Sequence, residues 1–288
     1  MDIENLKTFI TLSKLKNFTA TAEQHFIVQS TVTNRIVELE KEIGKKLFNR
    51  DRKNVSLTEE GTALLTYAKR IVELEETAIK ELSLLNSYND NLRVGTVNTV
   101  YDSYLYPYIS SFIKNNPDIS IDIIIDHSST LIRMLHDDIL DIAFTYIPIN
   151  KKGYSCIPFK KDNLILVTSP KNFTYPKGIH KEELPQLFYL YCDFIIQGEN
   201  NYIRDLFPKH YPFPFSIDKS TKLINYLKDG IGYSFIPKGL ILNELKNNEL
   251  IEIPLLDFKA PIIQSYCITT SSKNKFSKIQ NFINFSSI

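Results

Sequence analysis

Residues 26–37 read FIVQSTVTNRIV and mark the start of an amphipathic helix. From Val32 onward, apolar residues recur at Ile36, Leu39 and Ile43, the spacing of one stripe along a helix of about 3.6 residues per turn. This stripe is predicted to face a hydrophobic core. The opposite face carries Ser30, Asn34, Glu38 and Lys41, with Thr31 and Thr33 beside them and Arg35 at the margin. Such a face offers hydrogen-bonding groups to a partner outside the domain.

The residues before this helix predict a helix-turn-helix. Residues 3–12 place Leu6, Phe9 and Ile10 on one side of a helix, and Asn17-Phe18-Thr19 offers caps for a short helix over 19–26. Residues 27–29 are then predicted to form a tight turn, because two helices joined by about three residues make this motif. His25 is interpreted as a hydrogen-bonded histidine at the edge of the core.

The residues after Gly44 predict a two-stranded wing followed by a long helix. Residues 47–50 and 54–57 read as short strands that flank a charged tip at 51–53. Thr58 is predicted to cap the long helix. A heptad seam runs along this helix through Leu64, Ala68, Ile71, Ala78, Leu82 and Leu85, with Glu75 as its one polar member. Because such a seam needs a partner helix, we expect a dimer.

Beyond the polar residues 87–91, apolar strands alternate with helices. This order favours a parallel sheet with helices on its faces. One such unit extends from LRVGTVN at 92–98 to LDIAFTYIP at 140–148, and a second from LILVTSP at 164–170 to LIEIPL at 250–255. SYCITT at 265–270 and a helix near 276–285 are predicted to return to the first unit. Two lobes that the chain crosses twice are expected to form a cleft with a hinge.

Length and composition restrict the class of protein. A chain of 288 residues with 43% hydrophobic residues can fill two or three cores. The net charge is +1, but residues 1–58 contain 10 Lys and Arg against 7 Asp and Glu, so the N-terminal part is the basic one. MDIENLKTF is not a signal pattern and no run of about 18 apolar residues occurs, so we expect a cytoplasmic protein without a membrane partner.

No cofactor or metal is expected. Cys156, Cys192 and Cys267 are far apart without a C-x-x-C spacing, and we interpret them as buried residues rather than a disulfide or zinc framework. His127, His136, His180 and His210 show no metal-ligand spacing. The sequence also has none of the common nucleotide-binding, zinc-protease or hydrolase motifs, so we do not expect an enzyme.

Residues 17–71, from NFTATAEQHFIVQSTVTNRIV to LLTYAKRI, resemble the LysR-type transcriptional regulators, and the resemblance extends over essentially the whole chain. The matching positions are Phe18, Ala22, Gln29, Val32, Ile36, Leu39, Glu40, Gly44, Leu47, Phe48, Arg50, Leu57, Thr58 and Gly61. LRVGT, IRMLHDDILDIAF and LINYLKDGIGYSFIP are similar to the landmarks of the family's effector domain.

This resemblance implies an α/β multidomain fold. It would have a winged helix-turn-helix at 1–58, a linker and dimerisation helix at 59–88, and an effector-binding domain at 89–288 similar to type 2 periplasmic binding proteins. Lobe I would include about 91–163 and 267–288, and lobe II about 164–266. The implied partners are double-stranded DNA at dyad-symmetric promoter sites, a small-molecule effector, and further copies of the chain in a dimer and a tetramer. RNA polymerase is a candidate further partner.

The polar face of the helix is then the predicted DNA-binding surface, together with the wing. Its expected contacts are Gln29, Ser30, Thr31, Thr33, Asn34, Arg35, Arg50, Arg52 and Lys53. Ser30 stands where the family commonly has proline, and its hydroxyl could cap the helix or reach a phosphate. Asn34 suits adenine and Arg35 suits guanine in the major groove. The alternative is an ordinary solvent-exposed helix beside a charged hairpin.

By family position, the effector is expected between the lobes, near the ends of the first strands, where ligands collect in α/β sheets. The candidates are Thr96, Asn98, Thr99, Val100, Ser128, Ser129, Thr130, Thr145, Tyr146, Ile147 and Lys219, with Ser220 and Thr221 beside Lys219. Hydroxyl and amide donors there would suit a small anion or carboxylate. The alternative is that these residues only cap helices and form turns.

Two other functions remain open from the sequence. The two lobes alone would also suit a protein that binds a small molecule without DNA, although the winged helix argues against it. A peroxide sensor would need paired reactive cysteines, and Cys192 has no neighbouring cysteine in the sequence.

Overall fold

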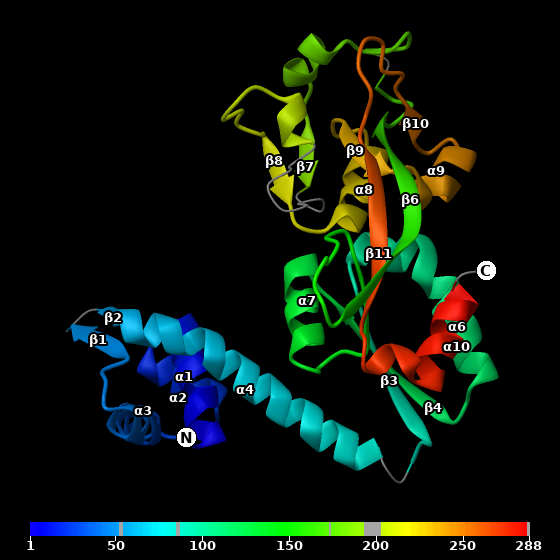
Figure 1. The fold of residues 1–288 in the computed structure, drawn as a ribbon. Coiled ribbons are helices and arrows are strands. Elements are labelled where there is room, and N and C mark those ends of the chain that lie inside the picture. The colour runs from blue at the N-terminus through cyan, green and yellow to red at the C-terminus, as the bar shows by residue number, and fades with distance from the viewer. Residues whose placement is uncertain (52–53, 85–86, 173, 193–202, 287–288) are drawn as a thin grey trace. The chain divides into compact units, whose positions relative to one another are not determined.

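The computed structural model describes residues 1–51, 54–84, 87–172, 174–192 and 203–286 (Figure 1). The chain divides into two compact units, Met1–Leu85 and Asn86–Ile288. Each unit has its own hydrophobic core.

The first unit is a winged helix-turn-helix, as predicted. Its elements are α1 (Ile3–Leu15), α2 (Phe18–Gln24), α3 (Gln29–Ile43), β1 (Phe48–Asp51), β2 (Asn54–Leu57) and α4 (Glu59–Leu84). The apolar stripe of α3 faces the core, where Val32, Ile36 and Leu39 are fully buried. Gly44 ends α3 in the left-handed conformation, with φ of 73°, which glycine adopts without strain.

A buried carboxylate connects α3 to the wing. Glu40 is 4% exposed, and its Oε1 accepts hydrogen bonds from the amides of Leu47 at 3.0 Å and Phe48 at 3.4 Å. Thr58 caps α4 as predicted, because its hydroxyl accepts a hydrogen bond from the Gly61 amide at 2.9 Å. A Cβ atom on Gly61 would lie 2.2 Å from the Leu47 carbonyl oxygen, so only glycine allows α4 to begin this close to the wing.

The first half of the heptad seam of α4 packs against its own unit. Ala68 is fully buried in the unit's own core, and Leu64 and Ile71 pack against the same core. Glu75 forms an ion pair with Lys7 of α1, Oε2 to Nζ 3.1 Å. This half of the seam therefore packs on α1 of the same chain. Ala68 is fully covered there and is not exposed for the predicted dimer contact, whereas the dimerisation role of the half-buried Leu64 and Ile71 stays a prediction.

The second half of the seam is exposed where it is described. Ala78 is exposed and Leu82 is 67% exposed, while Leu85 lies outside the described residues. Leu74 and Ile79 of α4 are also exposed beside this half of the seam. An apolar surface on this part of α4 remains available for a partner helix.

The second unit is built on a seven-stranded sheet in the order β10-β6-β11-β5-β3-β4, with β9 paired to β6. The strands are β3 (Asp90–Thr96), β4 (Ile119–Ile125), β5 (Ile142–Thr145), β6 (Tyr154–Thr168), β9 (Ser234–Pro237), β10 (Ile251–Glu252) and β11 (Ile262–Thr270). A separate pair contains β7 (Leu190–Cys192) and β8 (Phe215–Ile217).

The first three strands of the sheet along the chain pair in parallel, as predicted, but the sheet as a whole is mixed. β3 pairs in parallel with β4 and β5, whereas β11 is antiparallel to both β5 and β6. Figure 1 shows β6 and β11 as the two long central strands. Residues 154–163 of β6 pair with β11, and residues 164–168 pair with β9 and β10. Continuous strands, not loops, thus join a first lobe around β3–β5 to a second lobe around β7–β10.

Helices cover the sheet. They are α5 (Asn98–Val100), the π-helix η1 (Tyr101–Leu105), α6 (Tyr106–Asn115), α7 (Ser128–His136), η2 (Lys181–Gln186), η3 (Arg204–Leu206), α8 (Ser220–Lys228), η4 (Lys238–Ile241), α9 (Leu242–Lys246), η5 (Lys273–Lys275) and α10 (Ser277–Ser286). α10 packs beside α6 of the first lobe, where Phe112 and Phe282 stack edge to face. The C-terminal segment returns to the first lobe, as predicted.

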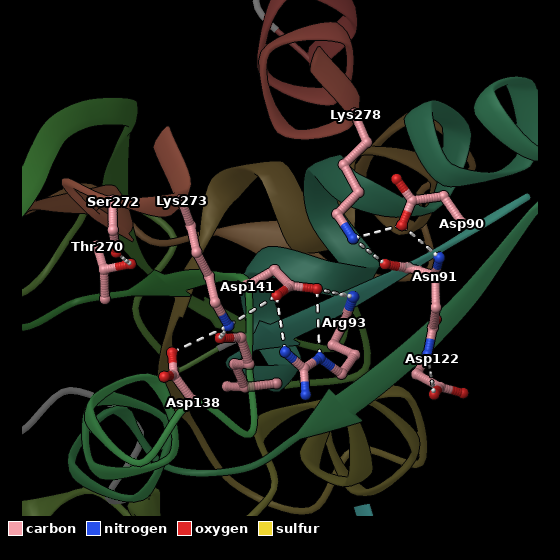
Figure 2. A network of polar contacts seen from close by, with 11 residues as sticks. Asp90, Asn91, Arg93, Asp122, Asp138, Asp141, Thr270, Ser272, Lys273 and Lys278 are labelled. Atoms are coloured by element: carbon pink, nitrogen blue, oxygen red, sulfur yellow. Dashed lines mark hydrogen bonds and ion pairs between the residues drawn. The ribbon is translucent and has the colours of Figure 1, made fainter. Parts of the chain in front are cut away.

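A polar network fixes this C-terminal segment (Figure 2). Asp141 Oδ1 contacts Arg93 Nη2 and Lys273 Nζ, both at 2.9 Å. Lys278 Nζ contacts Asp90 Oδ1 at 2.6 Å. Burial alone would raise the pKa of the Asp141 carboxyl, but the hydrogen bonds and charges of Arg93 and Lys273 outweigh it and lower the pKa to about 2. The network stabilises the return of the chain to β3.

Candidate nucleic-acid interface and effector site

The first residues of α3 form the exposed polar face that the sequence predicts. Gln29, Ser30 and Asn34 are exposed, and Thr31 and Thr33 are half-buried. Gln29 is positioned by the preceding helix, because the Thr19 hydroxyl donates to Gln29 Oε1 at 3.4 Å. The N-cap of α3 is Val28, which provides no side-chain capping bond, so Ser30 does not have the capping role considered for it.

Arg35 differs from the other predicted DNA contacts, because its guanidinium is directed toward α1. Nη1 donates to the Thr8 hydroxyl at 3.0 Å and lies 3.1 Å from Glu4 Oε2. Thr8 is fully buried, and the Arg35 side chain is 21% exposed. Arg35 therefore joins α3 to α1, and the base-reading role expected from the sequence stays a prediction. His25 is hydrogen-bonded to Thr11 at 2.8 Å, in agreement with its predicted structural role.

The structure describes the backbone of the wing at Arg50 but not the wing side chains predicted to contact DNA. Arg50 lies in β1, where it pairs with Val55 of β2. The Arg50 side chain and the whole of Arg52 and Lys53 lie outside the described residues.

Three of the predicted effector residues come together at the ends of the first-lobe strands. The hydroxyls of Thr99 and Tyr146 lie 2.8 Å apart, and the Tyr146 amide donates to Ser128 Oγ at 3.1 Å. These residues follow β3, β5 and β4, respectively, so the strand ends converge as expected. All three residues are buried.

Asn98 connects the two lobes. Its Nδ2 donates to Thr221 Oγ1 of α8 at 3.0 Å, across 123 residues of sequence. Ser220, the first residue of α8, is 1% exposed, and its Oγ has no hydrogen-bond partner within the described structure. A buried hydroxyl without a partner is costly, so this hydroxyl marks a place where a further polar group would be stabilising.

The other predicted effector residues differ in burial and in hydrogen bonding, and their effector role stays a prediction. The fully buried Thr96 and Thr145 donate to the carbonyls of Val97 at 3.1 Å and Ile147 at 2.8 Å. Val100 is fully buried in the core. Ser129 is exposed, and Thr130, Ile147 and Lys219 are half-buried, with Lys219 at the N-cap of α8.

A second contact between the lobes was not identified from the sequence. Tyr104 of η1 donates to Asp162 Oδ2 at 2.6 Å, and the Gly239 amide of η4 donates to the same oxygen at 3.1 Å. Burial, and then the hydrogen bond to Asp162, raises the pKa of Tyr104. A Cβ atom on Gly239 would lie 2.5 Å from the Tyr104 hydroxyl. In the sequence, the only indication of this contact between the lobes was the glycine that follows Pro237 and Lys238.

None of the three cysteines, which all lie in the described part, forms a disulfide, and burial raises the pKa of the Cys267 thiol to about 12. No cluster of three or more acidic, histidine or cysteine side chains with metal-binding geometry occurs among the residues that the structure describes. Within the same residues, no helix has the length and apolar character needed to cross a membrane.

Comparisons with known proteins identify the family. Residues 3–62 match the bacterial regulatory helix-turn-helix proteins of the lysR family, and residues 86–287 match the LysR substrate binding domain. The chain belongs to the LysR-type transcriptional regulators, a family of DNA-binding regulators with an effector-binding domain and not of enzymes.

Individual relatives agree with this assignment. The transcriptional regulator CitR of Bacillus subtilis (strain 168) is 29% identical over 290 residues, which cover 98% of each chain. The crystal structure of CbnR, a LysR family transcriptional regulator, has a TM-score of 0.71 at 17% identity and covers 99% of this chain and 98% of that chain. Full-length CbnR in complex with its target DNA has a TM-score of 0.67, also at 17% identity, covering 99% of each chain.

Proposed function

We propose that α3 enters the DNA major groove with Gln29 and Asn34 directed at base edges and with Ser30 and Thr31 beside the phosphates. The observation that carries this proposal is the exposed start of α3, where the Gln29 side chain is oriented by Thr19. Amide side chains are suited to adenine, and hydroxyls to phosphate oxygens. Arg50, Arg52 and Lys53 of the wing are proposed to add phosphate contacts, which would make affinity fall steeply with salt.

The exposed apolar residues of α4 support a dimer that places two α3 helices on a dyad-symmetric site. Ala78 and Leu82 project outside the unit's own core, and Leu85 continues the same spacing in the sequence. We propose that these residues meet the same helix of a second copy, and that two dimers associate into a tetramer through their effector domains. Sedimentation of the protein bound to DNA tests the tetramer, and the mass of one dimer would contradict it.

We also propose that a small carboxylate or other anion binds between the lobes beside Asn98, Thr221 and Ser220. The support is the Asn98–Thr221 hydrogen bond, which joins the lobes next to the unpartnered hydroxyl of Ser220. The start of the nine-residue helix α8 provides backbone amides and a positive dipole end for an anion. Thr99 and Ser128 would contribute from the first lobe.

Such a ligand would regulate transcription by changing how the lobes close, and thereby promoter binding or DNA bending. A ligand that replaced Thr221 as the partner of Asn98 would alter the contact that holds the lobes together. This is allostery only if the ligand binds the alternative DNA-bound states with unequal affinity.

Mapping where the full-length protein binds across its own genome, at two salt concentrations, tests the DNA proposal. We expect salt-sensitive binding at a few dyad sites, lost in Asn34→Ala and retained in Lys41→Ala, which changes an exposed residue near the other end of α3. Equal occupancy by wild type and Asn34→Ala would contradict the role of Asn34. The absence of any preferred site would favour the alternative of a ligand-binding protein that acts without DNA.

Thermal unfolding with acetate, succinate and benzoate, each beside its neutral amide, tests the ligand class. We expect a carboxylate to raise the unfolding temperature of the wild type and not of Asn98→Ala or Ser220→Ala. Ser216→Ala, an exposed serine of β8, should respond as the wild type does. No shift with any carboxylate, or equal shifts with the amides, would contradict an anion site.

A further inference from the structure

Two apolar side chains project from the turn between α2 and α3. Phe26 is 95% exposed and Val28 is 65% exposed, whereas Ile27 between them is half-buried and its amide donates to the Ala22 carbonyl at 3.0 Å. The turn is thus anchored at Ile27, and the residues on either side of it extend outward. Large apolar residues this exposed bring no stabilisation to the fold itself.

Both residues also break a local rule of protein structure. Phe26 has a positive φ of 55°, which is unusual for a bulky residue and common for asparagine. Val28 occupies the N-cap of α3 without a side-chain oxygen to accept from the helix amides. Valine is among the poorest N-cap residues, and serine is among the best. Deviations of this kind from local preference concentrate at functional sites.

We infer that Phe26 and Val28 contact the C5-methyl groups of thymines in the DNA site, and so contribute to sequence preference. This inference rests on the proposed entry of α3 into the major groove. In that groove the thymine methyl is the apolar group on the base edges, and small apolar or phenyl side chains are its usual partners. Val28 directly precedes Gln29, at the end of the helix where recognition helices of this kind contact bases.

DNA suits this pair of residues better than a protein partner does. Exposed polar residues surround the pair, with Glu23 and Gln24 before it and Gln29 and Ser30 after it. A stable protein interface buries about 800 Å² on each partner, which is far more than two side chains supply. A thymine presents one apolar methyl group among hydrogen-bonding base edges, so a small apolar contact within a polar surface suits it.

Replacement of single thymines by uracil measures this contact, because uracil lacks only the C5-methyl group. The duplex is first selected from random sequence with the full-length protein, and each thymine is then replaced in turn. We expect one or two replacements to weaken binding of the wild type about fourfold each, the equivalent of ~0.8 kcal/mol for one buried methylene-sized group. The remaining replacements should have no effect.

Two variants test whether these side chains cause the weaker binding to uracil, and neither is expected to destabilise the fold. Val28→Ser supplies a good N-cap and Phe26→Asn suits the positive φ, so both should be at least as stable to heat as the wild type. In each variant, binding should no longer distinguish thymine from uracil at one of the sensitive positions. Val37→Ala, an exposed valine later in α3, should keep the full sensitivity.

The possible results distinguish failure of the methyl contact from failure of the proposed entry of α3 into the major groove. The methyl contact is refuted if uracil is tolerated at every position, or if the effect of uracil is the same in Val28→Ser and Phe26→Asn as in the wild type. In either case, loss of sequence selectivity in Gln29→Ala would still support the proposed DNA interface. If the full-length protein selects no sequence at all, both fail.

Discussion

Arg35 of α3 and Glu4 of α1 form an ion pair, with Nη1 3.1 Å from Oε2. The same nitrogen donates to Thr8, whose hydroxyl in turn donates to the Glu4 carbonyl at 2.8 Å. Because Glu4 is half exposed, the ion pair itself contributes little, and the hydrogen bond to the buried Thr8 contributes more. The arginine thus helps to hold the recognition helix at its angle to α1.

Arg35→Ala should therefore lower the stability of the first unit by ~1–2 kcal/mol, because it removes a charged hydrogen bond and leaves the Thr8 hydroxyl without its donor. Hydrogen exchange of residues 3–15 measures the effect within the intact protein. Glu4→Gln should cause a smaller change. Unchanged protection in Arg35→Ala, together with a loss of sequence preference, would show that Arg35 reads bases after all.

Leu82→Asp should remove the α4 contact between copies and lower the sedimentation mass, leaving a folded protein that associates at most through its effector domains. Leu82 is 67% exposed, so a charge there opposes only the contact with a second copy. Ala68→Asp should instead unfold the first unit, because Ala68 is fully buried against the core of its own chain. Sedimentation and circular dichroism distinguish the two results, with Glu76→Ala as an exposed control on the same helix. An unchanged sedimentation mass in Leu82→Asp would place this subunit contact elsewhere.

Gly239→Ala should disrupt the contact between the lobes. The added Cβ atom would approach within 2.5 Å of the Tyr104 hydroxyl and 2.8 Å of Asp162 Oδ2, so one partner must move. We expect a loss of roughly 1–3 kcal/mol, the usual cost of overpacking, in urea unfolding of the full chain. Tyr104→Phe removes the hydroxyl, and the double variant should lose less than the two single variants combined. Strict additivity would show that the clash involves other atoms.

Stability should fall in acid through Asp141. Its pKa is about 2 in the folded protein against an ordinary value of 3.8, so the native state favours the charged carboxylate. The resulting stabilisation, on the order of 2 kcal/mol, is fully present above about pH 4 and is lost as the pH falls toward 2. Asp141→Asn should be less stable than the wild type at pH 6, and this difference should shrink between pH 4 and 2. A constant difference over that range would contradict the assigned pKa.

The sequence predicted those features that depend on local periodicity. The stripe from Val32 to Leu39 faces the core, and Thr58 caps α4, because residue spacing and capping chemistry act within a few residues of sequence. The family resemblance predicted that Thr99, Ser128 and Tyr146 would meet at the strand ends.

Contacts between residues that are far apart in the chain could not be predicted from the sequence. A helical wheel gives the direction in which Arg35 leaves its helix, but not where so long a side chain ends. Ala68 has the same spacing whether it packs on α1 or on another subunit. The antiparallel pairing of β6 with β11 joins residues about 100 positions apart, such as Asp162 and Ile263. The Ser220 hydroxyl was a candidate only by its position at a helix start, because burial without a partner is visible only in three dimensions.

The most direct test of the account is the ratio of affinities for the selected duplex and a scrambled one, measured at fixed salt for wild type, Gln29→Ala and Asn34→Ala. Residues that read bases should lower the ratio, with about 1–3 kcal/mol of selectivity lost per variant and little change on the scrambled duplex. Equal losses on the two duplexes would reduce Gln29 and Asn34 to phosphate contacts. A ratio near one for the wild type would contradict recognition of DNA sequence by α3.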